Sequence, residues 1–188
     1  MSSKAIVLLA VLVVATQTLC CGAILGSPKP PYTVDPSDET LDRLQEEMET
    51  IEADNEDQLT FTITEEEMTA LVVQMLEEME DPPPVSQPQV LFRNDRVELY
   101  ATIHVSDSTE VQGMVALTLG VQDGHIVATI EEIDVGPLPV PESFIEAATD
   151  NLNQAIDDWV LDNMGDYVIT DVKIGDKKAV IYGQVSER

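Results

Sequence analysis

Three consecutive glutamates, Glu65 to Glu67, could form an acid cluster that does chemistry. They follow an alternating apolar and polar segment and precede an apolar stretch that starts at Met68. Paired catalytic carboxylates need side chains that converge on a substrate and environments that separate their pKa values. Three consecutive residues of a helix point in different directions, and we expect these three to point into water. The run of glutamates alone therefore does not indicate a catalytic site.

The start of a helix accounts for the same residues. Thr64 followed by Glu67 matches a capping box, in which the threonine hydroxyl accepts from the backbone N–H three residues on and the glutamate accepts from the threonine N–H. Glu65 and Glu66 would lie in the first helical turn, where the helix dipole favours negative charge by ~0.3–1 kcal/mol each. The sequence therefore favours helix initiation over acid–base catalysis at this position.

Other residues that could support catalysis or metal binding lack a matching motif. The chain has no glycine-rich phosphate loop, no His-Glu-x-x-His and no nucleophile elbow. His104 and His125 fall on a polar strand face or beside a turn, so we expect both to be solvated. Five acidic and amide residues could suggest a calcium site: Asp150, Asn151, Asn153, Asp157 and Asp158. They lie in a helical stretch rather than in a loop with EF-hand spacing, so we expect no metal, no cofactor and no enzymatic activity. A hydrolase is the weakest alternative.

The N-terminal residues 1–26 have the composition of a signal or anchor segment. An unbroken apolar run extends from Ala5 to Ala15, and a second apolar piece reaches Leu25. Together these pieces span the ~20 residues that a bilayer helix needs. We expect an uncleaved membrane anchor, with acylation at Cys20 or Cys21 and full secretion as the alternatives. In all three cases the rest of the chain lies outside the cytoplasm.

The composition limits the partners of this exported part. The 188 residues carry a net charge of -27, with only nine Lys and Arg. A phosphate backbone needs such cations to displace its counterions, so we expect no contact with nucleic acid. The same charge repels an anionic lipid surface. No cysteine follows Cys21, so the exported domain must be held by its apolar core rather than by disulfides.

Residues 27–57 read as a proline-rich spacer followed by an acidic helix. Leu41, Leu44, Met48 and Ile51 form a narrow apolar stripe about three turns long. A helix of this length is marginal alone, so it either docks on the domain or projects as a stalk. The sequence favours the stalk slightly.

Residues 58–188 predict one α+β domain. An alternating segment and the helix after Thr64 precede four antiparallel strands, a helix that starts near Pro141, and a final hairpin. Asp123-Gly124 is a hairpin signal, and Glu131-Glu132 shifts the strand alternation as a bulge would. We expect one curved antiparallel sheet packed around two amphipathic helices.

Both predicted helices offer an apolar face to this sheet. Seven of their residues are candidates to line a groove for a lipid: Met68, Leu71, Val72, Met75, Leu152, Ile156 and Trp159. The stripe of the first helix is rich in methionine, which is common where a surface adapts to varied shapes. Taken residue by residue, these side chains fit an ordinary core better than a groove.

Four stretches of the sequence resemble a known family. They are "LTFTITEEEMTALVVQML" (59–76), "VELYATIHV" (97–105), "VQGMVALTLGVQDGHIVATIEEIDVGPLPVPESFIEAATDNLNQAI" (111–156) and "YVITDVKIGDKKAVIYGQV" (167–185). Their succession is similar to that of YpmS-like bacterial envelope proteins, which are loosely related to the tubular lipid-binding (TULIP, BPI-like) superfamily. The resemblance implies a curved sheet that wraps a long helix around a lipid groove.

Two functions are compatible with these observations. The first is a membrane-tethered, extracytoplasmic, non-enzymatic module that binds a lipid or an apolar ligand between its sheet and its helices. The alternative is an interaction or assembly protein of the cell envelope, with a fully packed core and no ligand. The first is favoured because the resemblance adds a groove to the apolar helical faces.

Overall fold

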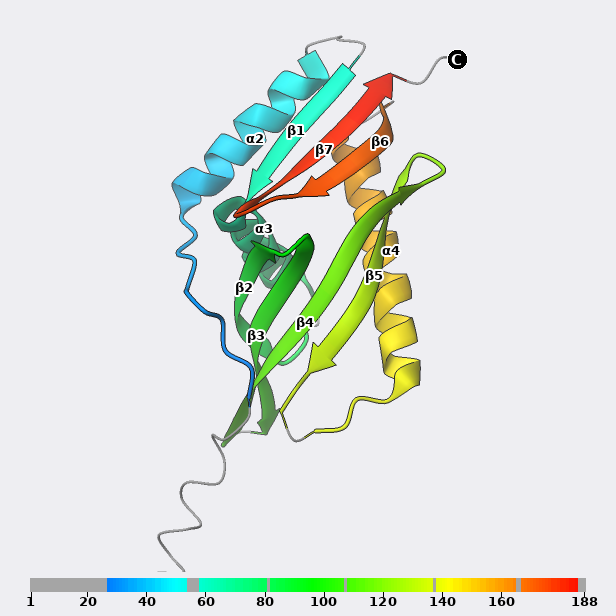
Figure 1. Cartoon of the computed structure of the whole chain (residues 1–188). Coiled ribbons are helices and arrows are strands. Elements are labelled where there is room, and N and C mark those ends of the chain that lie inside the picture. The colour runs from blue at the N-terminus through cyan, green and yellow to red at the C-terminus, as the bar shows by residue number, and fades with distance from the viewer. Residues whose placement is uncertain are drawn as a thin grey trace, which may run out of the picture.

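The protein has the α+β architecture that the sequence predicts (Figure 1). The computed structural model describes residues 27–53, 58–80, 82–106, 108–136, 138–164 and 167–185. Ten elements follow one another in these residues: α2 (Asp38–Ala53), β1 (Gln58–Thr64), α3 (Glu65–Glu78), β2 (Val85–Arg93), β3 (Arg96–Ser106), β4 (Thr109–Gln122), β5 (His125–Asp134), α4 (Glu142–Met164), β6 (Tyr167–Ile174) and β7 (Lys178–Val185). This is the predicted order of strands and helices. The expected membrane anchor, residues 1–26, lies outside the described residues.

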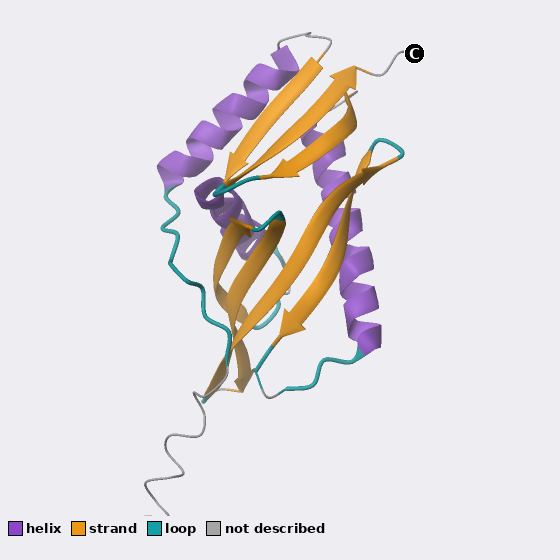
Figure 2. Ribbon diagram, in the orientation of Figure 1, coloured by secondary structure: helices purple, strands orange, loops and turns teal. Residues whose placement is uncertain are grey.

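The strands form two antiparallel sheets, which corrects the expectation of a single sheet. One sheet has the order β1-β7-β6 and the other has the order β2-β3-β4-β5. Figure 2 shows the two groups of strands one above the other, with helices to the left and right. Side chains of α3 and α4 occupy the outer edges of β2 and β5, so the closing hairpin β6–β7 pairs with β1 instead. Two backbone hydrogen bonds join the sheets, from Ile169 N to Gly124 O at 3.1 Å and from Lys177 N in the β6–β7 turn to Phe92 O at 3.4 Å.

Two local features of the larger sheet are confirmed. Asp123 and Gly124 have φ values of 52° and 86° and connect the pair Gln122 and His125, as expected for a two-residue hairpin turn. In the β4–β5 pairing, Ala116 faces Glu132 while Leu117 faces Ile130. Glu131 is therefore the extra residue of a bulge, at the predicted position.

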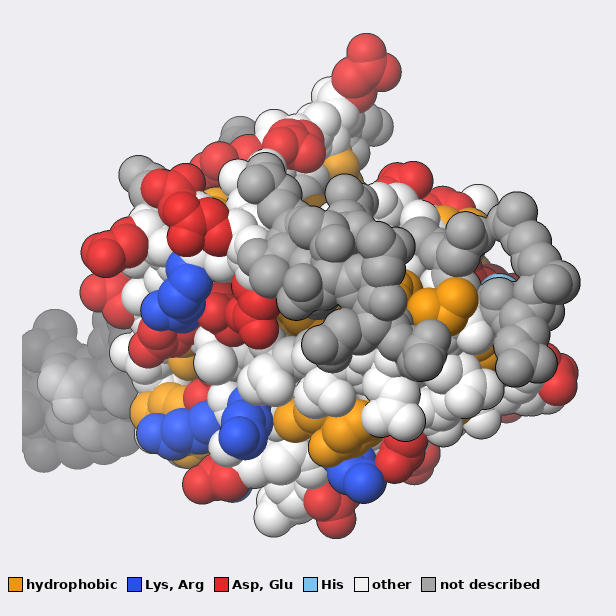
Figure 3. Space-filling view, turned by 90° about the horizontal axis from the view of Figure 1, so that it is seen from above, with side chains coloured by type: hydrophobic (Ala, Val, Ile, Leu, Met, Phe, Trp, Pro, Cys, Tyr) orange, Lys and Arg blue, Asp and Glu red, His pale blue; other side chains and the backbone are white. Residues whose placement is uncertain are grey.

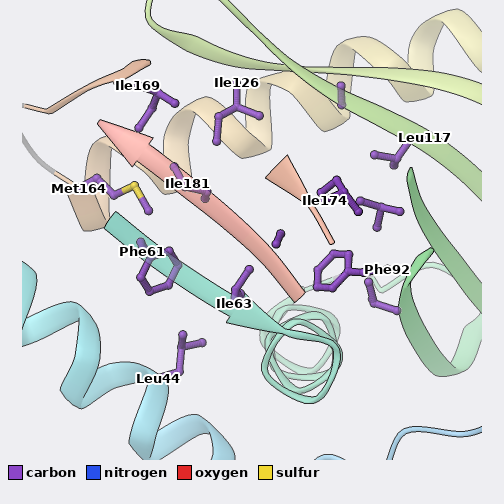
Figure 4. Close-up of a cluster of buried hydrophobic side chains, with 14 of the residues drawn as sticks. Leu44, Phe61, Ile63, Phe92, Leu117, Ile126, Met164, Ile169, Ile174 and Ile181 are labelled. Atoms are coloured by element: carbon purple, nitrogen blue, oxygen red, sulfur yellow. The ribbon is translucent and has the colours of Figure 1, made fainter. Parts of the chain in front are cut away.

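The main core lies between the two sheets and the helices. Figure 4 shows Phe61 and Ile181 of the smaller sheet, Phe92 and Ile126 of the larger one, and Leu44 of α2 around a common centre. Leu44 is only 1% exposed. The segment for which the sequence favours a stalk is thus docked on the domain, because its apolar stripe has the main core to bury against.

Residues 27–37, which we call the strap, are extended and run along the larger sheet (Figure 1). Val34 of the strap joins a second cluster of buried side chains on the outer face of this sheet: Leu91, Tyr100, Met114 and Ala116. Tyr32 packs against the same cluster. The larger sheet therefore has apolar contacts on both faces, and the proline-rich segment covers the outer one.

Candidate functional site

The glutamates at the start of α3 form the predicted capping box. Thr64 Oγ1 accepts from Glu67 N at 3.3 Å, and Glu67 Oε2 accepts from Thr64 N at 2.8 Å. Glu66 is exposed, but Glu65 and Glu67 are only 4% and 3% exposed, so the expectation that all three point into water is wrong for these two. Glu67 also accepts from Arg43 of α2 at 2.9 Å. Its buried charge is therefore compensated by a cap and an ion pair.

Glu65 has a structural role at the edge of β2. Its Oε1 accepts from Phe92 N at 2.9 Å and from the Tyr32 hydroxyl at 2.7 Å. One turn later, Thr69 Oγ1 accepts from Val90 N at 3.0 Å. Burial and the bond to Glu65 together raise the pKa of Tyr32 to about 12. These contacts bind α3 and the strap to the edge strand β2. They explain why a glutamate is buried at position 65 without a catalytic role.

Helix α4 holds the opposite edge of the larger sheet in the same way. Asn153 Oδ1 accepts from Ala128 N at 2.7 Å, and its Nδ2 donates to Ala128 O at 3.1 Å. One turn later, Asp157 lies 3.2 Å from His125 Nδ1. Two residues of the acidic helical stretch thus bind β5. In the described part of the chain, no three His, Cys, Asp or Glu residues are placed to hold a metal ion.

Between the two helices lies an apolar strip of sheet that is incompletely covered. Its residues share the inner face of β3, β4 and β5, and we call them the open sheet face: Ala101, Ile103, Gly113, Val115, Ile133 and Val135. All except Gly113 are half-buried. A Cβ on Gly113 would lie 2.7 Å from Ile103 Cδ1 and 3.3 Å from Val135 Cγ1. The absent side chain lets its neighbours close over the middle strand.

The outer face is better covered on β3 and β4. Thr102, Met114 and Ala116 alternate with the open sheet face, and all three are buried. The strap covers that side, and the main core covers the inner face only farther along the strands, where Leu117 and Ala128 are buried. An antiparallel sheet usually buries its apolar face and exposes its polar one. Here an apolar inner strip remains partly open, flanked by α3 at β2 and α4 at β5.

The seven predicted groove residues divide into two groups. Five are partly buried and pack against the main core: Met68, Val72, Leu152, Ile156 and Trp159. The Trp159 ring lies 6.1 Å from the Phe61 ring, centre to centre. Leu71 is half-buried and Met75 is 38% exposed. The apolar faces of both helices thus contribute to the core, and the sequence did not single out the strand residues of the open sheet face. The only local indication of the open sheet face in the sequence was Gly113, a glycine at a position where the alternating pattern of β4 otherwise has apolar side chains.

The surface around the domain is strongly acidic. In the view from above (Figure 3), Asp and Glu side chains are spread around the periphery of this face, and the Lys and Arg seen on it lie at the left and lower left, with one farther right. Repulsion from such a surface disfavours anionic groups. A ligand of the open sheet face would therefore be held by its apolar part.

No protein-family model, curated protein or solved structure matches this chain. Across the described residues, no helix is long and apolar enough to cross a membrane. Cys20 and Cys21, the two candidates for acylation, fall outside those residues.

Proposed function

We propose that the protein is a membrane-tethered, extracytoplasmic module that binds a lipid acyl chain or another apolar ligand on the open sheet face. The observation that carries this proposal is that the inner face of the larger sheet, which is apolar, is covered less completely than its outer face. Its inner apolar strip between α3 and α4 is half-buried, whereas Thr102 of β3 and Met114 and Ala116 of β4 are buried on the outer side, where the strap packs.

The energetics of such a site favour a long apolar ligand. Covering the partly exposed Ile and Val side chains removes apolar surface from water, and each buried methylene of a ligand contributes about 0.8 kcal/mol. Ile103, Val115 and Ile133 lie on three neighbouring strands, so an extended chain that crosses them would contact all three. The net charge of -27 disfavours an anionic headgroup, so the free energy of binding comes from the hydrocarbon part.

The cellular placement rests on residues 1–26. Their apolar run is the basis for proposing a single N-terminal anchor in the cell membrane, with the domain outside the cytoplasm. Such a tether would hold the open sheet face near a supply of lipid. Membership of the YpmS-like group and acylation of Cys20 or Cys21 remain predictions.

Lipid content and probe binding test the proposal. A protein that starts at residue 27 retains the strap and α2, which both belong to the packed structure. We expect native mass spectrometry to detect bound lipid and a fluorescent fatty-acyl probe to bind in a saturable way. The double variant Val115→Thr/Ile133→Thr makes the open sheet face polar with little change in shape and should weaken probe binding by on the order of tenfold.

Val127→Thr is the matched control for this experiment. Val127 is half-buried on β5, but it points to the other side of the sheet from Ala128, so probe binding should not change. If the wild-type protein holds no lipid and takes up no probe, the proposal fails, and an envelope assembly protein with a closed core becomes the better explanation.

A further inference from the structure

Three side chains on the outer face of the larger sheet form a chain of contacts that no function above uses. Ser86 Oγ lies 2.8 Å from His104 Nε2. On the other side of the ring, His104 Nδ1 lies 3.3 Å from Glu110 Oε1. A hydroxyl, an imidazole and a carboxylate in this order have the connectivity of the serine–histidine–acid triad of acyl-transfer enzymes.

Adjacent strands hold the three residues. Ser86 is on β2, His104 on β3 and Glu110 on β4, and His104 and Glu110 are direct partners in the antiparallel register. The backbone of His104 donates to Pro84 O at 2.8 Å, which ties this end of β3 to the start of β2. Sites carried by strands keep their geometry better than sites on loops. The His104 side chain is 40% exposed, in line with the predicted solvated histidine, and its ring also has two partners.

The position of each partner gives its role. Glu110 next to Nδ1 favours the tautomer in which Nδ1 carries the proton. Nε2 then has a free lone pair and can accept the hydroxyl proton of Ser86. Glu110 also stabilises the imidazolium that forms when this proton is transferred. His104 is thus oriented as a general base toward Ser86.

The backbone next to Ser86 is unusual. Gln87 has φ 53°, in the left-handed region that residues other than glycine rarely adopt. The β2–β3 register shifts between Ser86 and Gln89, so Gln87 and Pro88 lie outside the strand pairing. The N–H of the residue after a nucleophile often stabilises the oxyanion in serine hydrolases. The Gln87 N–H has that position in the sequence, and the bulge removes it from the ladder.

A cavity of about 680 Å³ lies between the strap and the outer sheet face; of the three side chains it reaches Glu110, whereas Ser86 and His104 are not part of its wall. Glu110 and Gln87 are part of its wall. The remaining wall is rich in amides and hydroxyls, which include Gln89, Gln112 and Thr33. Pro30, Val111 and Tyr100 add apolar surface to the wall, so it suits a molecule that has both hydroxyl groups and an apolar part. It lies on the side of the sheet opposite the open sheet face and is independent of it.

From this geometry we propose a second activity: the hydrolysis of short-chain acyl esters of polyhydroxylated alcohols, with Ser86 as nucleophile, His104 as general base and Glu110 as the residue that orients His104. Ser86 Oγ bonds to the ester carbonyl carbon while His104 Nε2 takes the hydroxyl proton. The C–O bond to the alcohol then breaks, and the alcohol leaves with that proton. Water then attacks the acyl carbon while His104 Nε2 takes one of its protons. The bond from the acyl carbon to Ser86 Oγ breaks, the carboxylic acid leaves, and His104 returns the proton to Ser86 Oγ.

Covalent labelling of the full chain tests the nucleophile directly. A fluorophosphonate probe should modify Ser86, as located by peptide mass spectrometry, and Ser86→Ala should abolish labelling. Turnover should be measured with p-nitrophenyl acetate and with a peracetylated sugar. We expect Ser86→Ala to remove sugar deacetylation, and His104→Gln to lower its rate by ~10²–10⁴-fold, the usual contribution of a general base.

Matched residues provide the controls. Ser106→Ala removes an exposed hydroxyl from the end of β3. His125→Gln removes a histidine that has an acidic partner, Asp157, but no serine hydroxyl bonded to it among the described residues. Both variants should keep the wild-type labelling and rate. Glu110→Gln should lower the rate while leaving Ser86 open to slow labelling. Wild-type protein that is not labelled at Ser86, or deacetylation that is equal in Ser86→Ala and wild type, would overturn the proposal.

Discussion

Asn153 binds both backbone groups of Ala128, and through these two hydrogen bonds a helix replaces the strand that β5 lacks. The acceptor bond measures 2.7 Å and the donor bond 3.1 Å. On the opposite edge, Glu65 and Thr69 accept from backbone N–H groups of β2. Unpaired edge strands invite further strands or aggregation. Side chains of α3 and α4 therefore limit the larger sheet to four strands.

The first prediction concerns this edge. Asn153→Ala leaves Ala128 N and O without their side-chain partner, and an unsatisfied buried group costs about 1–3 kcal/mol. We expect urea unfolding to show a loss of stability in this range, with an increased tendency to aggregate. Asn151→Ala changes an exposed residue of the same helix and should stay within about 0.5 kcal/mol of wild type. Equal stability of the two variants would show that Asn153 does not hold the edge.

The second prediction concerns the docking of α2. Leu44 is 1% exposed in the main core, so Leu44→Ala should lower the free energy of unfolding by about 2–5 kcal/mol. Gln45→Ala, at the neighbouring exposed position, should change it little. In a protein whose acidic helix projected as a stalk, the two substitutions would have the same small effect on urea unfolding.

Local rules explain what the sequence could predict of this fold. The capping box at Thr64, the turn at Asp123-Gly124 and the bulge at Glu131 each depend on a few neighbouring residues. Strand alternation likewise showed which residues share a face of the larger sheet. These features depend on sterics and hydrogen bonds between residues that are close in the sequence, so the sequence alone is enough to predict them.

Long-range partners explain what it could not predict. The separation into two sheets depends on Asn153, Thr69 and Glu65, whose partners on the sheet edges are 21 to 27 residues away. Glu65 is buried because Tyr32 and the edge of β2 supply donors, although a charged residue is normally exposed. The open sheet face was missed for a related reason. Alternation identifies a face, but the strap and the helices determine which part of it is covered.

The third prediction concerns pH. Burial and hydrogen bonds to Glu65 and Glu98 raise the pKa values of Tyr32 and Tyr100, respectively, to about 12, from 10 in the unfolded chain. Between these values the folded state binds more protons than the unfolded state, so stability should fall as the pH rises from 10 to 12. Below pH 10 this contribution is fully present.

Phenolate absorbance measures these groups directly. Tyr32→Phe and Tyr100→Phe should each remove one phenol from the fraction that ionises near pH 12, and each should flatten the pH dependence of unfolding above pH 10. If neither substitution changes that fraction in the native protein, the hydroxyls are not held by the two glutamates.

The fourth prediction concerns the junction of the two sheets. Gly124 has φ +86°, and a Cβ there would lie 2.6 Å from Val168 Cγ1 at the start of β6. Its carbonyl accepts from Ile169 N. Gly124→Ala must therefore adopt a strained backbone and displace a neighbouring strand at once, for a cost of about 1–3 kcal/mol. Gly120→Ala is the control, because a Cβ at Gly120 meets no atom within 4 Å and Ala is favoured over Gly in a strand by about 0.5–1 kcal/mol. Thermal unfolding should thus move in opposite directions for the two variants, and hydrogen exchange at Ile169 should speed up only in Gly124→Ala, since only that substitution loosens the contact between the sheets.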